Sequence, residues 1–201
     1  MQKVQRQVRS PLMMLVATAM LSAVALVLFL LEFPLLPMVP FMKMDFSDIP
    51  AVFGGVLFGP LCGVLVELFK NLLEMLIKGM GSQMGFGNLQ NFLVGCAYVL
   101  PFSILYRMME RRSWNRVRGL ILAAAAGIAA ILTVGFFSNL AVAPLYFRVF
   151  LNNPLGEGEA LAVAVSSLLF NSLKSLILSV ILPPLLTLSL PPVRRALGRI
   201  E

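Results

Sequence analysis

Long apolar stretches without a charged residue constrain this chain more than any other feature. The stretches from Leu12 to Leu31 and from Gly119 to Phe147 contain no Asp, Glu, Lys or Arg. An α-helix needs about 20 apolar residues to cross the hydrocarbon core of a bilayer. Only 12% of the residues are charged, whereas soluble domains have about 25%. The sequence therefore predicts a single all-α integral membrane domain that covers residues 1–201, in a lipid bilayer.

Six transmembrane helices fit the apolar stretches. The Gly59-Pro60 pair divides one long stretch, and because proline suits the first turn of a helix, the third helix is expected to begin there. The second helix is short for a complete crossing, and Pro183-Pro184 should kink or end the sixth. The first helix follows a basic segment but has no clear small-residue cleavage site, so we expect it to be retained. We place the helices near 11–31, 48–59, 60–77, 88–108, 119–145 and 160–189.

The basic residues predict the orientation of the helices. Eleven of the 16 Lys and Arg residues lie before the first helix, between the fourth and fifth, or after the sixth. Cytoplasmic segments of membrane proteins are rich in Lys and Arg. Both termini are therefore predicted to be cytoplasmic, and the loops 32–47, 78–87 and 146–159 to lie outside. The net charge of +7 is then explained by the orientation of the helices in the membrane, and we expect no nucleic-acid partner.

The chain lacks the residues and motifs that several classes of enzyme and metal site usually need. The chain has no histidine, which removes the commonest general base and metal ligand. Cys62 and Cys96 lie far apart in apolar segments, without metal-ligand spacing. The chain also lacks a phosphate-binding loop and a nucleophile elbow. A Ser–Lys dyad is possible by composition but has no supporting pattern. We expect no enzyme activity, no metal and no cofactor.

The third predicted helix carries four polar residues on one face. Glu67, Lys70, Asn71 and Glu74 follow the spacing i, i+3, i+4, i+7. Lys70 is placed to pair with Glu67 and with Glu74. One interpretation is an internal ion network that holds the helices together. The other is that Asn71 and Glu74, nearer the outer end, reach a binding cavity.

The fourth to sixth predicted helices carry three amides and a lysine, namely Asn91, Asn139, Asn171 and Lys174. Polar residues inside a membrane are costly and are usually functional, although an isolated asparagine can simply bridge two helices. Amides present a donor and an acceptor side by side, and a lysine donates to carbonyl or anionic groups. The set is suited to a planar heterocycle with lactam-like edges, while Met and Phe of the outer loops would contact its faces.

The stretch FMKMDFSDIP, residues 41–50, puts Lys43, Asp45 and Asp48 into an otherwise apolar part of the chain. Three prolines at 34, 37 and 40 stiffen the segment before it. Ser47 or Asp48 is expected to cap the second helix. A cap does not explain Asp45, nor the flanking Phe41 and Met44, so we also interpret residues 41–48 as a lid over the predicted pocket.

The first predicted helix has a smooth side that includes Ala19-x-x-x-Ala23. Small residues four apart allow another helix to approach closely. This side either packs inside the protein or forms a docking face for a partner subunit.

Several of these stretches together resemble one known family. They are MKMDFSDIP (42–50), GPLCGVLVELFKNLLEMLIKG (59–79), NFLVG (91–95), SNLAVAPLYF (138–147) and FNSLKS (170–175). In this order the chain resembles the riboflavin-specific substrate-binding (S) component of bacterial energy-coupling factor (ECF) transporters, from about residue 12 to 190. The family usually has a G-[EQ]-x-A-N-F run, where this chain has Gly87-Asn88-Leu89-Gln90-Asn91-Phe92. The changes at 88 and 90 leave the contacts of those two positions open.

The resemblance implies a six-helix protein of the bacterial plasma membrane that binds riboflavin from outside. It also implies a complex with a membrane-spanning coupling subunit and two cytoplasmic ATPase subunits. Riboflavin would be a transported ligand, held by polar residues that correspond to Asn139, Asn171 and Lys174. Our own hypothesis, which joins this resemblance to the residue pattern, is that the ribityl hydroxyls reach toward Asp45 and Asp48. The alanine-rich face, with Ala19 and Ala23, would dock on the coupling subunit.

Other functions remain open from the sequence. A transporter of the same class could bind another vitamin or a flavin nucleotide, although a phosphate group would require arginines near the outer mouth, and only Arg148 lies there. A membrane scaffold or enzyme without a transported ligand is the alternative of a different class.

Overall fold

The computed structural model describes residues 11–36, 42–79, 85–149 and 152–198. These ranges contain six helices and one short two-stranded ribbon, which confirms the all-α prediction. The helices are α1 (Pro11–Leu30), α2 (Asp48–Leu57), α3 (Pro60–Lys78), α4 (Phe86–Arg111), α5 (Arg116–Val149) and α6 (Glu157–Leu197). The ribbon joins β1 (Phe33–Pro34) to β2 (Lys43–Met44) in antiparallel register, with Phe33 opposite Met44.

Four of the helices within these ranges, α1, α4, α5 and α6, are long and apolar enough to cross a membrane. The ten residues of α2 are too few for a complete crossing. The 19 residues of α3 include Glu67, Lys70, Glu74 and Lys78. Length and composition therefore support four spans, and a crossing by all six helices remains a prediction.

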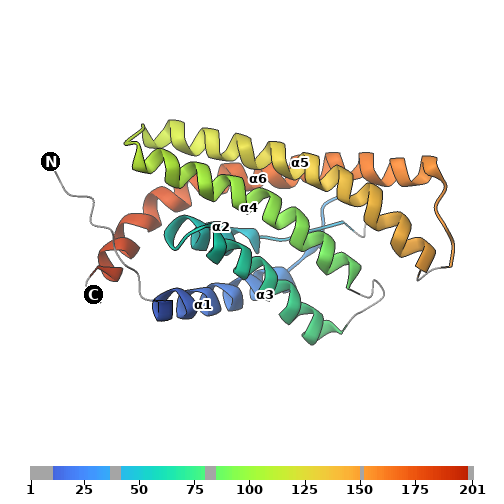
Figure 1. Cartoon of the computed structure of the whole chain (residues 1–201), viewed down its shortest axis with the longest axis horizontal. Coiled ribbons are helices and arrows are strands. Elements are labelled where there is room, and N and C mark those ends of the chain that lie inside the picture. The colour runs from blue at the N-terminus through green and yellow to red at the C-terminus, as the bar shows by residue number, and fades with distance from the viewer. Residues whose placement is uncertain (1–10, 37–41, 80–84, 150–151, 199–201) are drawn as a thin grey trace.

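The helices form two layers, with α4, α5 and α6 side by side in one and α1, α2 and α3 in the other (Figure 1). The short α2 contacts α1 and α3 in its own layer and α4 and α6 in the other. Gly63 allows this close approach: a Cβ there would lie only 2.6 Å from Val99 and 2.8 Å from the backbone oxygen of Ala51. The fold therefore holds the beginning of α2 in the interior, where polar side chains need internal partners.

The two proline-containing pairs affect their helices differently. Gly59 adopts a φ of +124°, which favours glycine, and α3 begins at Pro60 as predicted. The Pro183-Pro184 pair does not end α6, which continues to Leu197, beyond the predicted limit of 189. Its C-terminal part turns away from the line of its first part (Figure 1). Proline removes one backbone hydrogen bond and crowds the preceding turn, so it bends a helix that packing still supports.

The ends of the helices sort into two groups in space. The beginning of α1, the α4–α5 turn and the end of α6 lie toward one end of the molecule (Figure 1). The end of α5 and the beginning of α6 lie at the opposite end (Figure 1). The segments that are richest in arginine thus gather at one end, around 107–118 and 194–195.

Candidate functional site

A cavity of about 370 Å³ lies between α4, α5, α6 and the segment that leads into β2. Its volume falls in the range of small-molecule sites, about 300–1,000 Å³. Its lining includes residues at the beginning of α4, near the end of α5 and in the first half of α6. Its lining residues are Met42, Lys43, Phe86, Gly87, Gln90, Asn91, Val94, Asn139, Val142, Ala143, Tyr146, Phe147, Val163, Ser167, Phe170, Asn171 and Lys174.

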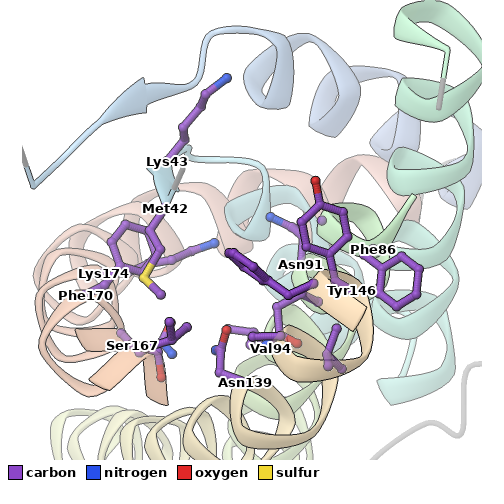
Figure 2. Close-up of a pocket in the computed structure, with 17 residues that line it drawn as sticks. Met42, Lys43, Phe86, Asn91, Val94, Asn139, Tyr146, Ser167, Phe170 and Lys174 are labelled. Atoms are coloured by element: carbon purple, nitrogen blue, oxygen red, sulfur yellow. The ribbon is translucent and has the colours of Figure 1, made fainter. Parts of the chain in front are cut away.

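The fold brings the four polar residues that the sequence singled out to this one cavity. Asn91 comes from α4, Asn139 from α5, and Asn171 and Lys174 from α6. Asn91, Asn139 and Lys174 point toward the same space in Figure 2. Asn171 and Lys174 are nearly inaccessible to solvent, with 2% of each residue exposed. The cavity thus has a polar interior inside an apolar bundle.

Hydrogen bonds fix which atoms two of the amides offer to the cavity. Asn139 donates from Nδ2 to the backbone oxygen of Gly135 at 2.8 Å, which leaves its Oδ1 as an acceptor. Asn91 accepts at Oδ1 from Nδ2 of Asn71 at 3.4 Å, which leaves its Nδ2 as a donor. Gly135 also allows Asn171 to lie against α5, because a Cβ there would be only 2.2 Å from Nδ2 of Asn171. The site therefore presents both donors and acceptors in set positions.

Apolar and aromatic side chains form the rest of the lining. The rings of Phe86 on α4 and Tyr146 on α5 have centroids 5.7 Å apart, and Phe147 meets Tyr146 edge-on at 5.6 Å. Met42, Val94 and Phe170 lie around the same space (Figure 2). Such surfaces suit the faces of a flat ring system. The sequence did not single out Phe86, because an aromatic residue at a helix end is common in membrane proteins. Tyr146 could have been found, since it lies in the SNLAVAPLYF stretch.

Beside the cavity, Lys70 forms the centre of a fully buried ion cluster. Its Nζ donates to Oγ of Ser47 and to Oδ1 of Asp48, each at 2.6 Å. It also forms an ion pair with Oε2 of Glu67 at 2.7 Å. These contacts surround the ammonium with three oxygens, two of them in hydrogen-bond geometry. Lys70 therefore holds α2 against α3, and it does not line the cavity.

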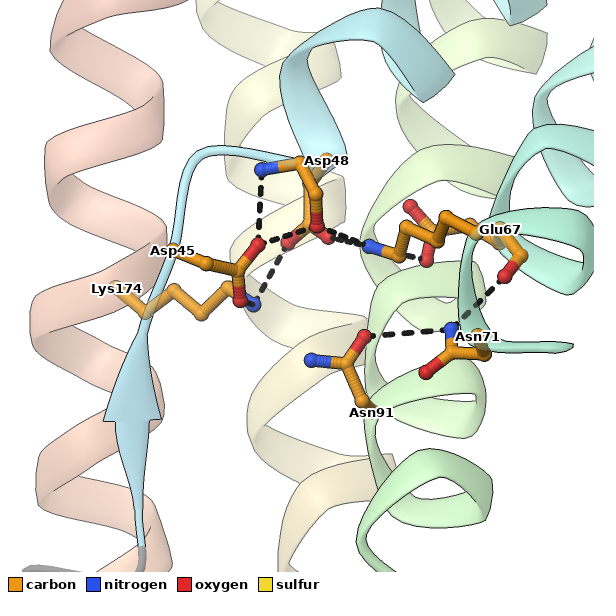
Figure 3. Close-up of polar contacts among 8 residues, drawn as sticks. Asp45, Asp48, Glu67, Asn71, Asn91 and Lys174 are labelled. Carbon is orange, nitrogen blue, oxygen red and sulfur yellow. Dashed lines mark hydrogen bonds and ion pairs between the residues drawn. The ribbon is translucent and has the colours of Figure 1, made fainter. Parts of the chain in front are cut away.

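Lys174 shares a counter-ion with Lys70 but also faces the cavity. Its Nζ lies 2.9 Å from Oδ2 of Asp48, outside hydrogen-bond geometry, and donates weakly to Oδ2 of Asp45 at 3.5 Å. Asp48 thus bridges the two lysines, one through each oxygen (Figure 3). Within the described ranges these two carboxylates are the polar partners of Lys174. At least one of its N–H groups remains for a ligand.

The residues predicted to form a lid were expected to contact a ligand, but most of them do not line the cavity. Asp45 and Asp48 are buried and contact lysines, and neither lines the cavity. Met44 is fully buried and does not line it either, whereas Met42, two residues earlier, does. Phe41 lies outside the described residues. The carboxylates are therefore oriented toward the lysines that neutralise them, because a buried charge without a partner is strongly disfavoured.

Two local interactions predicted from the sequence are wrong, namely the side-chain cap of α2 and the ion pair between Lys70 and Glu74. Ser47 is the N-cap residue of α2 but makes no side-chain cap, since its hydroxyl donates to Asp45 and accepts from Lys70. Asp48 lies in the first helical turn, and its carboxylate binds the lysines. Glu74 pairs with Lys78 at 3.1 Å and accepts from Asn88 at 2.6 Å, in place of the expected Lys70. Lys70 instead meets Asp48, a nearer carboxylate that only the tertiary fold supplies.

Neither Asn71 nor Glu74 lines the cavity, so the suggestion that they reach it is wrong. Asn71 supports the site indirectly through its contact with Asn91. Asn88 likewise lies outside the lining and donates to the backbone oxygen of Asn71 at 3.0 Å. Gln90, the second position left open by the sequence, does line it.

An outer ion cluster connects the lid to α1 and α3. Glu32, just after α1, accepts from Lys43 of β2 at 2.7 Å and from Lys78 of α3 at 2.9 Å. Partial burial disfavours the Glu32 carboxylate, but the hydrogen bonds and charges of the two lysines outweigh it and lower the pKa of Glu32 below its usual range. Lys43, at the cavity mouth, is thereby engaged by a carboxylate.

The predicted docking residues Ala19 and Ala23 are exposed on α1. The inner side of this helix consists of Thr18, Ser22, Ala25 and Phe29. Internal packing therefore does not explain the Ala19-x-x-x-Ala23 pattern, because those two residues lie on the other side.

Comparisons with known proteins agree with this geometry. Residues 13–186 match the model of the family described as "ECF transporter, substrate-specific component". The chain is 34% identical to riboflavin transporter FmnP of Bacillus subtilis (strain 168) over 83% of this chain and 86% of that protein. It is 30% identical to riboflavin transporter RibU of Staphylococcus aureus (strain TCH60) over 83% and 85%. A solved structure of the S component of a bacterial ECF transporter superposes with a TM-score of 0.64 at 26% identity, over 94% of this chain and 97% of that one.

Proposed function

The chain belongs to the family of ECF transporter substrate-specific components, and on that premise we propose that it is a membrane-embedded riboflavin-binding subunit of a vitamin importer. The relatives reported above are named riboflavin transporters, not enzymes. The observation that carries the proposal is the cavity in which Asn91, Asn139, Asn171 and Lys174 meet between apolar walls. Riboflavin is then a transported ligand and not a cofactor.

The cavity matches the two kinds of surface that a flavin presents. The faces of the tricyclic ring are apolar and would lie against side chains such as Val94, Phe170 and Tyr146. The edge of the ring carries carbonyl oxygens, ring nitrogens and an imide N–H. The donors of Lys174 and Asn91 suit the carbonyls, and Oδ1 of Asn139 suits the N–H.

The roles of Asp45 and Asp48 change in this proposal. Both are oriented toward Lys174, so we assign them to positioning its ammonium instead of binding ribityl hydroxyls directly. A lysine side chain has many rotamers, and two carboxylates at one end of it restrict them. Pre-ordering the donor in this way lowers the entropic cost of ligand binding.

The arginine-rich end supports a proposal for the orientation in the bacterial plasma membrane. We propose that both termini and the α4–α5 turn are cytoplasmic, because arginines gather there (Figure 1). The cavity then opens toward the outer side, where the vitamin is captured. Six crossings would also place both termini on the same side. In that case α2 and α3 would together fill the space between the longer helices.

Delivery inward requires partners, which the family provides. We propose that the exposed face of α1 with Ala19 and Ala23 docks on a membrane-spanning coupling subunit, which in turn engages two cytoplasmic ATPase subunits. The face is exposed and continues with exposed apolar residues such as Leu15 and Met20. Small residues within an apolar surface favour close packing of helices in a bilayer.

A flavin nucleotide fits the site less well than riboflavin does. Its phosphate group would need an unpaired cation at the mouth. Lys43 is the basic residue that lines the cavity there, and its ammonium already pairs with Glu32. Arg148 is exposed at the end of α5 and does not line the cavity.

The proposal is tested by titrating riboflavin with the detergent-purified protein and following the quenching of flavin fluorescence. We expect tight binding by the parent protein and weaker binding, by about tenfold or more, for Asn139→Ala and Lys174→Ala. Thr133→Ala is a matched control, because Thr133 is an exposed polar residue of α5 that bonds only within its own helix. If the parent leaves riboflavin fluorescence unchanged, the proposed function is wrong. If both cavity variants bind riboflavin as tightly as the control variant does, the assignment of Asn139 and Lys174 to the binding site is wrong.

A further inference from the structure

The ion cluster around Lys70 continues through Asp48 to Lys174, and it contains more acids than bases. Three carboxyl groups and two ammonium groups are joined by ion pairs, and each residue is at most 2% exposed. With every member ionised, three negative and two positive charges leave a net charge of −1. A buried charge without compensation is strongly disfavoured, and a buried group often takes up a proton instead. The members are Asp45, Asp48, Glu67, Lys70 and Lys174.

Hydrogen bonds show which of the three carboxyl groups has the least support for a negative charge. Asp45 accepts from the backbone N–H of Ser47 at 2.8 Å and from its hydroxyl, and Asp48 accepts from Lys70. Neither oxygen of Glu67 accepts a hydrogen bond from any described residue. Its Oε2 lies 2.7 Å from Nζ of Lys70, but outside hydrogen-bond geometry. Glu67 is therefore the member least suited to stay ionised.

The helices packed against α3, namely α1, α2 and α4, bring no second cation to Glu67. On α4 the carboxyl group lies against Gly95, where a Cβ would be 2.3 Å from Oε2. The neighbouring Cys96 brings a thiol, which carries no positive charge. The group that α2 contributes is Asp48, another acid, and α1 has no charged residue. Across the part of the chain that the structure describes, Lys70 is the cation that forms an ion pair with Glu67.

We propose that Glu67 is a buried proton-binding site, whose carboxyl group is neutral in the folded protein at neutral pH. One bound proton leaves the cluster with two positive and two negative charges. The ammonium of Lys70 repels a proton from the adjacent Oε2, so the proton lies on Oε1 and Oε2 is the carbonyl oxygen. Asp45 and Asp48 then remain the ionised partners of the two lysines (Figure 3). The inference goes beyond the proposed function and does not depend on it.

A bound proton determines the sign of the effect of removing this carboxyl group. An unfolded chain releases the proton of a glutamate above about pH 4.3, so the folded parent holds one proton more than the unfolded parent. Its unfolding equilibrium constant should then increase about tenfold per pH unit relative to that of Glu67→Gln, whose amide is neutral in both states. In thermal unfolding of the detergent-purified proteins, Glu67→Gln should match the parent near pH 4 and unfold at a higher temperature at pH 7.

Glu74→Gln is the matched control, because Glu74 lies about two turns further along the same helix. Its carboxylate forms an ion pair with Lys78 at 3.1 Å and accepts a hydrogen bond from Asn88 at 2.6 Å. Removing a carboxylate with these partners should lower the unfolding temperature at pH 7, which is the opposite of the result expected for Glu67→Gln.

Infrared spectroscopy detects the proton directly, because the C=O stretch of a protonated carboxyl group has a higher frequency than that of a carboxylate. At pH 7 the parent should show this band, Glu74→Gln should keep it and Glu67→Gln should lack it. Exchange into heavy water should lower the frequency of this band, which distinguishes it from the ester band of bound lipid. The inference is overturned if the parent lacks the band or if Glu67→Gln retains it. It is also overturned if Glu67→Gln does not fold, or unfolds at a lower temperature than the parent at pH 7.

Discussion

The two buried lysines of this protein, Lys70 and Lys174, share Asp48 as a counter-ion but lie in different surroundings. Lys70 is enclosed by Ser47, Asp48 and Glu67 and does not line the cavity. Lys174 meets two carboxylates and still lines a cavity. Both are charged residues inside an apolar bundle, so burial alone does not distinguish them.

The difference teaches that hydrogen-bonding capacity facing a cavity separates a binding residue from a structural one. A buried ammonium with three partners contributes to cohesion between α2 and α3. A buried ammonium with a free N–H beside a cavity is prepared for a ligand. The same criterion identifies Asn91 and Asn139, whose partners account for one end of each amide and not the other.

The first prediction concerns the enclosed lysine and has the largest expected effect. Lys70→Met leaves Asp48 and Glu67 buried with one cation fewer, so the protein should lose about 3–5 kcal/mol of stability. Thermal unfolding of the detergent-purified variant measures the loss. Lys78→Met is the control, because Lys78 is partly exposed and its ion pairs contribute at most about 1 kcal/mol. Equal unfolding temperatures for the two variants would show that the enclosed cluster does not hold the fold.

The second prediction concerns the open lysine. Lys174→Met should weaken riboflavin binding by about a hundredfold, equivalent to about 2.7 kcal/mol, because it removes a charge-assisted hydrogen bond. Its effect on the unfolding temperature should be smaller than that of Lys70→Met, since Asp48 keeps Lys70 and Asp45 keeps the hydrogen bonds from Ser47. The comparison between the lysines breaks down if Lys174→Met unfolds at as low a temperature as Lys70→Met does.

Glycines next to each region provide the third prediction. A Cβ at Gly95 would lie 2.3 Å from Oε2 of Glu67, in the enclosed cluster. A Cβ at Gly135 would lie 2.2 Å from Nδ2 of Asn171, in the cavity wall. Gly95→Ala should therefore cost about 1–3 kcal/mol of stability with little change in affinity. Gly135→Ala should displace Asn171 and weaken riboflavin binding by about tenfold, equivalent to about 1.4 kcal/mol.

The glycine experiment needs both readouts on both variants, by thermal unfolding and by fluorescence titration. Gly158→Ala is the control, because a Cβ placed there meets nothing within 4 Å apart from its chain neighbours and its own helix backbone. If Gly95→Ala changes affinity as much as Gly135→Ala, the enclosed cluster and the cavity behave as one unit.

Much of the fold and of the site could be predicted because the relevant signals are local. The apolar stretches predicted helices, and the Gly59-Pro60 pair predicted the beginning of α3. Amides and a lysine in apolar segments predicted cavity residues, since a membrane leaves polar groups few alternatives. The spacing of Asn171 and Lys174 placed them on one face, and both line the cavity.

The remaining contacts could not be predicted because they join residues far apart in the chain. Lys174 meets Asp45 across 129 positions of sequence, and Lys70 meets Asp48 across 22. The spacing on α3 suggested Glu74 as a partner of Lys70, but tertiary packing supplied Asp48. Asp48 also has the properties of a helix cap, so its sequence position alone could not distinguish a cap from a counter-ion. Gln90 lacks a local signal because only the tertiary fold places it in the cavity wall.

The last prediction sharpens the comparison by moving it to the protein surface, where the outer cluster of Glu32, Lys43 and Lys78 repeats the chemistry of the buried one in contact with water. The pKa of Glu32 is lowered from an ordinary value of 4.5. A lowered pKa means that the folded state holds the carboxylate more strongly than the unfolded state does, so its contribution is complete above about pH 4.5 and disappears as the pH falls through the lower, folded-state value. Glu32→Gln should therefore have a free energy of unfolding lower than that of the parent at pH 7, by less than about 1 kcal/mol. The two values should converge as the pH is lowered through this range.

Salt near 1 M should reduce the difference in stability at pH 7, because a Debye length of about 3 Å screens exposed ion pairs. The loss of stability caused by Lys70→Met should stay unchanged. A difference between Glu32→Gln and the parent that persists at both low pH and high salt would mean that Glu32 acts through packing, and that solvent exposure does not separate the two clusters.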